Sequence, residues 1–122
     1  MDINMNDSVN AKVLDSTLLC GYVESLGVDI VKQMMELYQQ QSALYLKEIN
    51  AALKLNTQVS WQESCHKMKG AAGSVGLKEV HSFLVSIEKS TVDQREKEDF
   101  LVRLNQLNEH GIAAFQYWLK IV

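Results

Sequence analysis

The segment REKEDFLVRLNQLNEHGIAAFQYWLKI, residues 95–121, decides the fold class of this chain. Its apolar and small residues return at alternating intervals of four and three positions, which places them along one side of a helix. The stripe consists of Phe100, Leu104, Leu107, Gly111, Ala114, Trp118 and Ile121. A stripe of this length is typical of a helix that packs along its whole length inside a helical bundle.

The same helical period extends toward the N-terminus and predicts four further helices. The expected helices span residues 15–27, 29–54, 60–74, 77–89 and 95–121. Asp15 is a suitable N-cap for the first of them, and Gly27 ends it. Proline, which interrupts helices, is absent from all 122 residues. The sequence therefore predicts an all-α fold, an up-down-up-down four-helix bundle with a short N-terminal helix that caps one end.

The N-terminal residues 1–13 carry little apolar pattern and several Asn and Asp residues. We expect them to be a flexible lead-in or the end of an interdomain linker, followed by one bundle domain over residues 14–122. No apolar run approaches the roughly 18 residues that a membrane-spanning helix needs, so direct membrane insertion is not expected. The polar N-terminus has neither a secretion signal nor a basic transit pattern, which favours the cytoplasm.

Charge and cysteine content exclude further classes of protein. Lys and Arg number 12 against 15 Asp and Glu, a net charge of −3, which is unfavourable for neutralising the phosphates of a nucleic acid. The two cysteines, Cys20 and Cys65, do not make a disulfide framework, and we expect both to be small core residues. His81 and His110 are expected at the surface.

The most unusual stretch is SCHKMKGAAGSVG, residues 64–76. On a helical wheel one arc collects the apolar residues and should face the core. This arc contains Trp61, Cys65, Met68, Ala71, Ala72 and Val75. His66 points away from the arc, with Gly70 and Gly73 on its own side. Each glycine costs about 1 kcal/mol inside a helix, so two of them beside one histidine need a reason.

Gly70 and Gly73 are the residues whose side chains would otherwise cover the ring of His66. Their absence exposes the imidazole and lets a macromolecule approach the helix backbone. Lys69, one turn along, could pair with a negative group attached to the ring. An exposed neutral imidazole nitrogen with a cation nearby is suited to carrying a phosphoryl group.

The pattern His66-x-x-Lys69-Gly70-x-x-Gly73-x-x-Gly76 resembles the signature of histidine-containing phosphotransfer (HPt) domains. The run HKMKGAAGSVGL is similar to the C-terminal HPt domains of bacterial hybrid sensor kinases, especially the anoxic-redox and trimethylamine-oxide sensing types. The resemblance implies that His66 is the phosphorylated histidine, that Lys69 lies near the phosphoryl group, and that the glycines expose the site and end the turn.

The family often has Gln or Glu 22 positions after the histidine, close to the ring. Here that residue is Glu88, which could hold one ring nitrogen and leave the other free, although its charge would repel an incoming phosphoryl group. Lys67, Lys69 and Lys78 are expected to complement the acidic pocket of a partner receiver domain.

The resemblance implies a phosphorelay. His66 would take a phosphoryl group from a receiver-domain phosphoaspartate and pass it to another receiver aspartate. The receiver would supply Mg²⁺, and the chain, expected to be a monomer, would need no cofactor of its own. No nucleotide-binding pattern is present, so we do not expect self-phosphorylation from ATP. The chain could be the terminal domain of a hybrid sensor kinase, on the cytoplasmic side of the inner membrane.

Three alternatives remain open at this point. The chain could be a non-catalytic helical adaptor that binds a signalling partner, or an acid–base enzyme that uses His66. The second is disfavoured because no pocket of titratable groups converges on His66. A zinc site from Cys65, His66 and His81 is also disfavoured, because the wheel sends Cys65 inward and His66 outward, and no metal is expected.

Overall fold

The computed structural model describes residues 11–122 of the chain. The helices that follow residue 15 are α2 (Ser16–Leu26), α3 (Val28–Leu55), α4 (Gln58–Ser74), α5 (Lys78–Ile87) and α6 (Gln94–Ile121). No strand occurs in the described residues. The predicted all-α class and the predicted order of helices are confirmed, and each helix boundary lies within two residues or so of its expected position.

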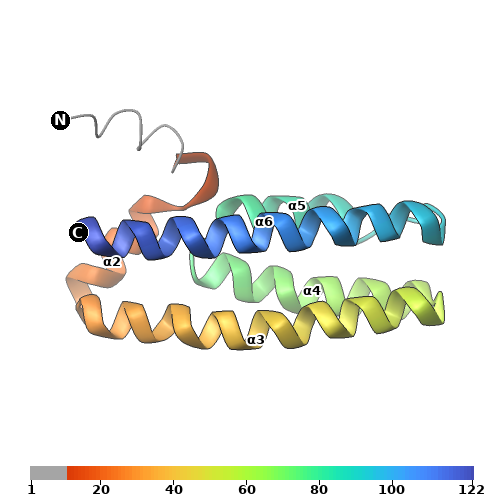
Figure 1. Ribbon diagram of the computed structural model, residues 1–122, viewed down its shortest axis with the longest axis horizontal. Helices are drawn as coiled ribbons and strands as arrows, with labels where there is room; N and C mark the ends of the chain where they lie inside the picture. Colours follow the sequence, from red (N-terminus) through yellow and green to blue (C-terminus); the bar gives the residue numbers. More distant parts are fainter. Residues whose placement is uncertain (1–10) are drawn as a thin grey trace.

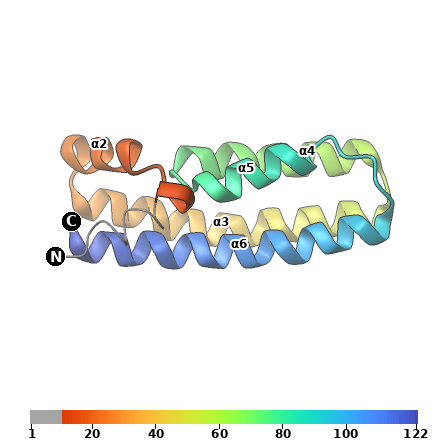
Figure 2. The same ribbon diagram turned by 90° about the horizontal axis from the view of Figure 1, so that it is seen from above.

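The two long helices, α3 and α6, lie side by side, and α4 and α5 form a second layer across them (Figures 1 and 2). Successive helices run in opposite directions, which gives the expected up-down-up-down bundle (Figure 1). The short helix α2 continues the layer of α4 and α5 over the first turns of α3 (Figure 2). The predicted cap at one end of the bundle is therefore present.

The core is made by the apolar stripes that the sequence predicts. On α4 the predicted inner arc is buried except Ala71, which is half-buried. On α6 the stripe is buried or half-buried up to Trp118, whereas Ile121, at the last turn, is 56% exposed. Cys65 is buried, but Cys20 is exposed, so the prediction of a core position for Cys20 is wrong. Its neighbour Leu19 fills the core position of α2 instead.

The N-terminal boundary of the folded part also differs from the prediction. Residues 11–13 are helical, and Val13 and Leu14 are 4% and 1% exposed. Because Val13 packs into the core, the bundle begins before the expected boundary at residue 14. The remaining part of the predicted lead-in, residues 1–10, lies outside the described residues.

The predicted cap at Asp15 is present, and the structure shows a second side-chain cap at Asp93. The Asp15 carboxylate accepts from the Leu18 backbone N–H at 3.1 Å, and the Asp93 carboxylate accepts from that of Glu96 at 2.9 Å. Gly27 has a φ of 87°, a left-handed conformation that suits glycine, so α2 can stop and α3 can start at once. This one-residue connection makes α2 and α3 antiparallel neighbours (Figure 2).

A polar cluster lies inside the bundle, between α3 and α6. The Tyr38 hydroxyl donates to Asn108 Oδ1 at 2.7 Å, and Asn108 Nδ2 donates to Ser42 Oγ at 3.1 Å. Burial raises the pKa of the Tyr38 hydroxyl well above its usual value, so the group stays neutral. Within residues 11–122, every buried side-chain nitrogen or oxygen has a hydrogen-bond partner.

None of the helices between residues 11 and 122 combines the length and the apolar composition that crossing a bilayer requires.

Candidate functional site

His66 projects from the outer side of α4. Its side chain is 71% exposed, whereas the adjacent Cys65 and the nearby Met68 are fully buried. The helical period alone explains this contrast, because consecutive residues of a helix point about 100° apart. The predicted outward direction of His66 is confirmed.

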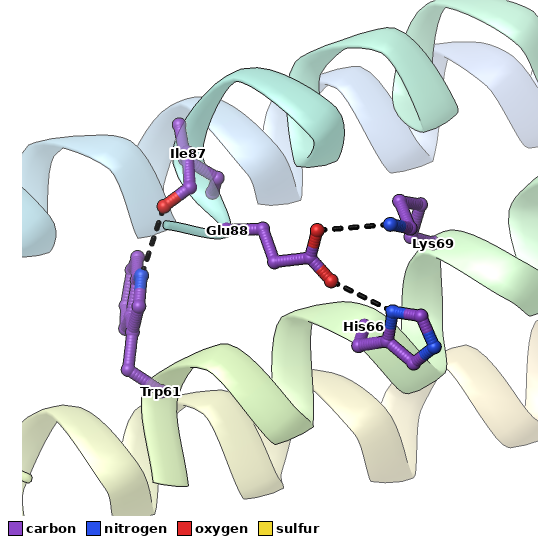
Figure 3. Close-up of polar contacts among 5 residues, drawn as sticks. All are labelled: Trp61, His66, Lys69, Ile87 and Glu88. Carbon is purple, nitrogen blue, oxygen red and sulfur yellow. Dashed lines mark hydrogen bonds and ion pairs between the residues drawn. The ribbon is translucent and has the colours of Figure 1, made fainter. Parts of the chain in front are cut away.

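Glu88 connects His66 to Lys69. One carboxylate oxygen, Oε1, lies 2.8 Å from His66 Nδ1, and the other, Oε2, lies 2.8 Å from Lys69 Nζ (Figure 3). Glu88 is the C-cap residue of α5, and only 10% of its side chain is exposed. The structure therefore places Glu88 beside the ring of His66, where the family resemblance locates it.

The ionisation of Glu88 fixes the tautomer of the neutral ring. The hydrogen bond from Lys69, and then that from His66, hold the pKa of the Glu88 carboxyl below its usual value against the opposing effect of burial. An ionised carboxylate only accepts hydrogen bonds, so Nδ1 must carry the proton that it donates. In a neutral imidazole this leaves the lone pair of Nε2 free, and the exposure of the ring makes it accessible.

Lys69 is on the expected side of α4, but its ammonium is not free. Its side chain is 22% exposed, and the nitrogen pairs with Glu88 at 2.8 Å. The sequence predicts a partner on the imidazole for Lys69 and does not anticipate this carboxylate contact, because Glu88 reaches the site from another helix.

The three glycines of the motif have three different surroundings. A Cβ atom at Gly70 would meet nothing within 4 Å, so this position is open, as predicted. A Cβ at Gly73 would lie 3.0 Å from Cδ2 of His81, so Gly73 allows α5 to pack closely against α4. The prediction that Gly73 serves access to His66 is thus corrected to a packing role, because its open side is occupied by His81, which is half-buried rather than at the surface.

Gly76 ends the turn after α4, as expected. Its φ is 75°, and a Cβ there would lie 3.0 Å from the side chain of Leu19. Gly76 is buried, so it cannot contact a docked protein, and its predicted part in docking is not supported. Its glycine is required by the backbone conformation and by the close approach of α2.

Comparison with known proteins identifies the architecture. The sequence model of the Hpt domain family matches residues 33–114, which is more than half of the chain. The chain belongs to the HPt domain family. The resemblance drawn from residues 66–76 is thereby confirmed.

The solved structures with the same architecture include the histidine-containing phosphotransfer domain of ArcB from Escherichia coli. One such structure has a TM-score of 0.81 at 20% identity and covers 91% of this chain and 96% of the other. A solution structure of that domain has a TM-score of 0.80 at 22% identity and covers 93% of each chain. At these identities the likeness establishes a shared fold.

The full-length relatives are much longer than this HPt chain. The aerobic respiration control sensor proteins ArcB of Escherichia coli K12 and of Shigella flexneri are each 22% identical over 115 residues, 93% of this chain. The aligned region covers 15% of each relative. Membership of the family places the chain among the phosphotransfer modules of two-component phosphorelays, which interact with receiver domains.

A shallow groove opens beside His66 on the surface of this HPt domain. It runs between α2, α3 and α4, and its floor and walls are largely apolar and aromatic. The lining residues include Tyr22, Met34, Leu37, Tyr45, Gly70 and Ala71. Leu37 is 54% exposed and lies beside the other apolar and aromatic side chains of the groove, and a contiguous apolar surface of this kind is typical of a protein-binding site. The residues that α3 contributes to the groove were not predicted from the sequence. Their signal is the pair of exposed leucines Leu37 and Leu44, seven positions apart on one side of α3, of which Leu37 lines the groove.

The remaining predicted docking lysines are not equivalent. Lys67 adjoins His66, is 60% exposed and pairs with Glu48 at 3.5 Å. Lys78 is the first residue of α5, whereas Glu88 follows the last residue of that helix. The Lys78 ammonium donates to the Ala11 carbonyl at 3.3 Å. The structure therefore brings Lys67 to the site and leaves Lys78 away from it, because α5 separates Lys78 from His66 by its whole length.

Within residues 11–122, no three or more His, Cys, Asp or Glu side chains gather in a way that could hold a metal ion. Cys65 is buried and His66 is exposed, as the helical wheel indicates. Burial, and next the nearby Glu88 carboxylate, raise the pKa of the Cys65 thiol to about 12, so this thiol remains protonated.

Proposed function

We propose that His66 accepts a phosphoryl group on Nε2 from the phosphoaspartate of a receiver domain and later passes it to an aspartate of another receiver. One observation carries this proposal: Glu88 Oε1 lies 2.8 Å from Nδ1 while the ring is 71% exposed. One ring nitrogen is thus held and the other is free, which is what a nucleophilic imidazole needs.

The transfer needs no base. The lone pair of Nε2 forms the N–P bond while the P–O bond to the donor aspartate breaks, and that electron pair leaves with the aspartate carboxylate. The product is a phosphorylated imidazolium that keeps its proton on Nδ1. Glu88, which already accepts that proton's hydrogen bond, neutralises the new positive charge. The reverse step follows the same path, so one site can receive and donate.

Lys69 complements the phosphoryl oxygens. In the unphosphorylated chain its ammonium rests on Glu88 Oε2 at 2.8 Å, one helical turn from His66. Once the ring is a cation, Glu88 has a second positive partner, and Lys69 can turn toward the added phosphate. Glu88 therefore holds two positive groups next to the phosphate, the imidazolium of His66 and the ammonium of Lys69. Their attraction for the phosphate offsets the repulsion by the Glu88 carboxylate.

The groove between α2, α3 and α4 is the surface on which the receiver docks. It adjoins His66 and offers exposed apolar side chains, Leu37 among them, together with Lys67 at the rim. An acidic receiver pocket, which would bring the Mg²⁺, complements Lys67 and Lys69. The chain acts as a monomer and needs no cofactor of its own. It works in the cytoplasm as one domain of a longer hybrid sensor kinase.

The test is phosphoryl transfer from a panel of purified receiver domains labelled with acetyl [³²P]phosphate. We expect label on the chain that is acid-labile and stable in base, with none on His66→Gln. His110→Gln is the matched control, because His110 is exposed on α6, and it should accept label at the rate of the unaltered chain. Receiver binding with no transfer would instead indicate the adaptor function and would contradict the proposal. Incubation with Mg²⁺ and ATP alone should leave the chain unlabelled.

A further inference from the structure

The end of α5 is held by a tryptophan from α4. The indole Nε1–H of Trp61 donates to the Ile87 carbonyl at 3.0 Å (Figure 3). The same carbonyl accepts from the Ser90 backbone N–H at 3.1 Å, so both of its lone pairs are used. Ile87 is the last residue of α5, and Glu88 follows immediately. Trp61 therefore fixes the backbone from which the Glu88 side chain projects.

A second contact from α4 holds the next part of this segment. Gln58 Nε2 donates to the Ser90 carbonyl at 3.0 Å, and Gln58 Oε1 accepts from Lys97 Nζ at 2.7 Å. The Lys97 ammonium also lies 5.1 Å from the centre of the Trp61 ring. Lys97 is only 6% exposed, and a buried ammonium is costly unless its contacts compensate. Its two partners are the two side chains that hold residues 87–90.

These contacts connect α4 to Glu88 by two routes. From α4, His66 and Lys69 bind the carboxylate of Glu88, while Trp61 fixes the backbone before it. A displacement of about 1 Å at a reacting group can change a rate by about 100-fold, so the position of this short segment matters. The positions after α5 are otherwise irregular until α6 begins at Gln94.

We propose that Trp61, supported by Lys97 and Gln58, is a positioning residue that sets the tautomer of His66 through Glu88. The purpose of this arrangement rests on the proposed function, since it keeps Nε2 free for the phosphoryl group. Trp61 is 1% exposed and also fills core space, so the test must separate its N–H from its bulk.

The decisive variant is Trp61→Phe, which keeps an aromatic ring in the core and removes the indole donor. Long-range ¹H–¹⁵N NMR of the His66 ring, at alkaline pH where imidazole is neutral, reads the tautomer directly. The unaltered chain should have its proton on Nδ1. In Trp61→Phe the population with the proton on Nε2 should rise at least threefold. Trp118→Phe, the same change in a buried tryptophan near the far end of α6, should leave the ring spectrum unchanged.

An unchanged His66 tautomer in folded Trp61→Phe, or an equal change in Trp118→Phe, would overturn the inference. If Trp61→Phe does not fold, Gln58→Ala replaces it, because Gln58 is only half-buried. That variant should move the tautomer in the same direction by a smaller amount, and no movement would also overturn the inference. The measurement uses no phosphate, so it stands even where the transfer assay contradicts the proposed function.

Discussion

Two clusters of three hydrogen-bonded side chains lie at different depths in this bundle. Tyr38, Ser42 and Asn108 join α3 to α6 in the interior, with bonds of 2.7 and 3.1 Å. His66, Lys69 and Glu88 join α4 to α5 at the surface, with two bonds of 2.8 Å. The inner cluster is closed, whereas the outer one leaves a ring nitrogen in solvent. Similar contacts thus close a buried cluster in one place and orient an exposed imidazole in the other.

The two clusters also differ in charge. Burial keeps the Tyr38 hydroxyl neutral by raising its pKa, while two cationic or polar donors keep Glu88 ionised by lowering its pKa. A neutral cluster can lie in the core at little electrostatic cost, but an ion pair needs partial access to water. The following changes test this division, from the largest expected effect to the smallest.

Asn108→Ala should lower the free energy of unfolding by roughly 2–4 kcal/mol, because it leaves the buried Tyr38 hydroxyl without its acceptor and opens a cavity. Urea unfolding measures the change, and phosphoryl transfer below the unfolding range should be unaffected. Asn105→Ala, an exposed change on the same helix, should stay within about 0.5 kcal/mol of the unaltered chain. Equal losses in the two variants would show that the inner cluster does not stabilise the fold.

Lys69→Gln should slow phosphoryl transfer roughly 10- to 100-fold, because the phosphoryl oxygens lose a charged donor. The rate from one labelled receiver, measured under single-turnover conditions, gives the effect. Lys67 pairs with the exposed Glu48 and serves docking rather than the transferred group, so at a saturating receiver concentration Lys67→Gln should change the single-turnover rate by less than about threefold. A greater effect at Lys67 than at Lys69 would mean that encounter with the receiver, rather than the outer cluster, limits transfer.

Glu88→Gln should lower the free energy of unfolding by about 1 kcal/mol at pH 7, because the charged acceptor of two hydrogen bonds is lost. Since the pKa of Glu88 is lowered on folding, its contribution is full above the unfolded value near 4.3 and is lost as the pH falls through the folded value. Urea unfolding at pH 7, 5 and 3 should therefore show the difference shrinking at the lowest pH. Exposed Glu63→Gln is the control, and a difference for Glu88→Gln that does not depend on pH would contradict this account.

Gly70→Ala should raise the free energy of unfolding by about 1 kcal/mol, because nothing lies near the added methyl and alanine favours a helix. The free energy of unfolding of Gly73→Ala should be about 1 kcal/mol lower than that of Gly70→Ala, because the added methyl would contact His81. Thermal unfolding of both variants gives the comparison. Equal gains at the two positions would mean that His81 yields freely and that Gly73 is not a packing residue.

Most of the fold could be predicted because it depends on residue patterns within single segments of the sequence. The stripe on α6, the outward direction of His66 and the cap at Asp15 all follow from helical geometry along a single segment. The prediction for Cys20 was wrong because α2 is short and buries only one narrow side, and neighbouring Leu19 takes that side.

The sequence by itself determined the helices, the class of the fold and the exposed histidine with its open glycine, since each depends on residues a few positions apart. Only the tertiary structure decided which side chains meet across helices. It added Lys69 to the contact between Glu88 and His66 that the family resemblance implies, set Gly73 against His81, kept Lys78 away from the site and placed Trp61 under the end of α5. Contacts of this kind depend on how two helices are rotated and shifted against each other, and the packing of the whole core sets that rotation and shift.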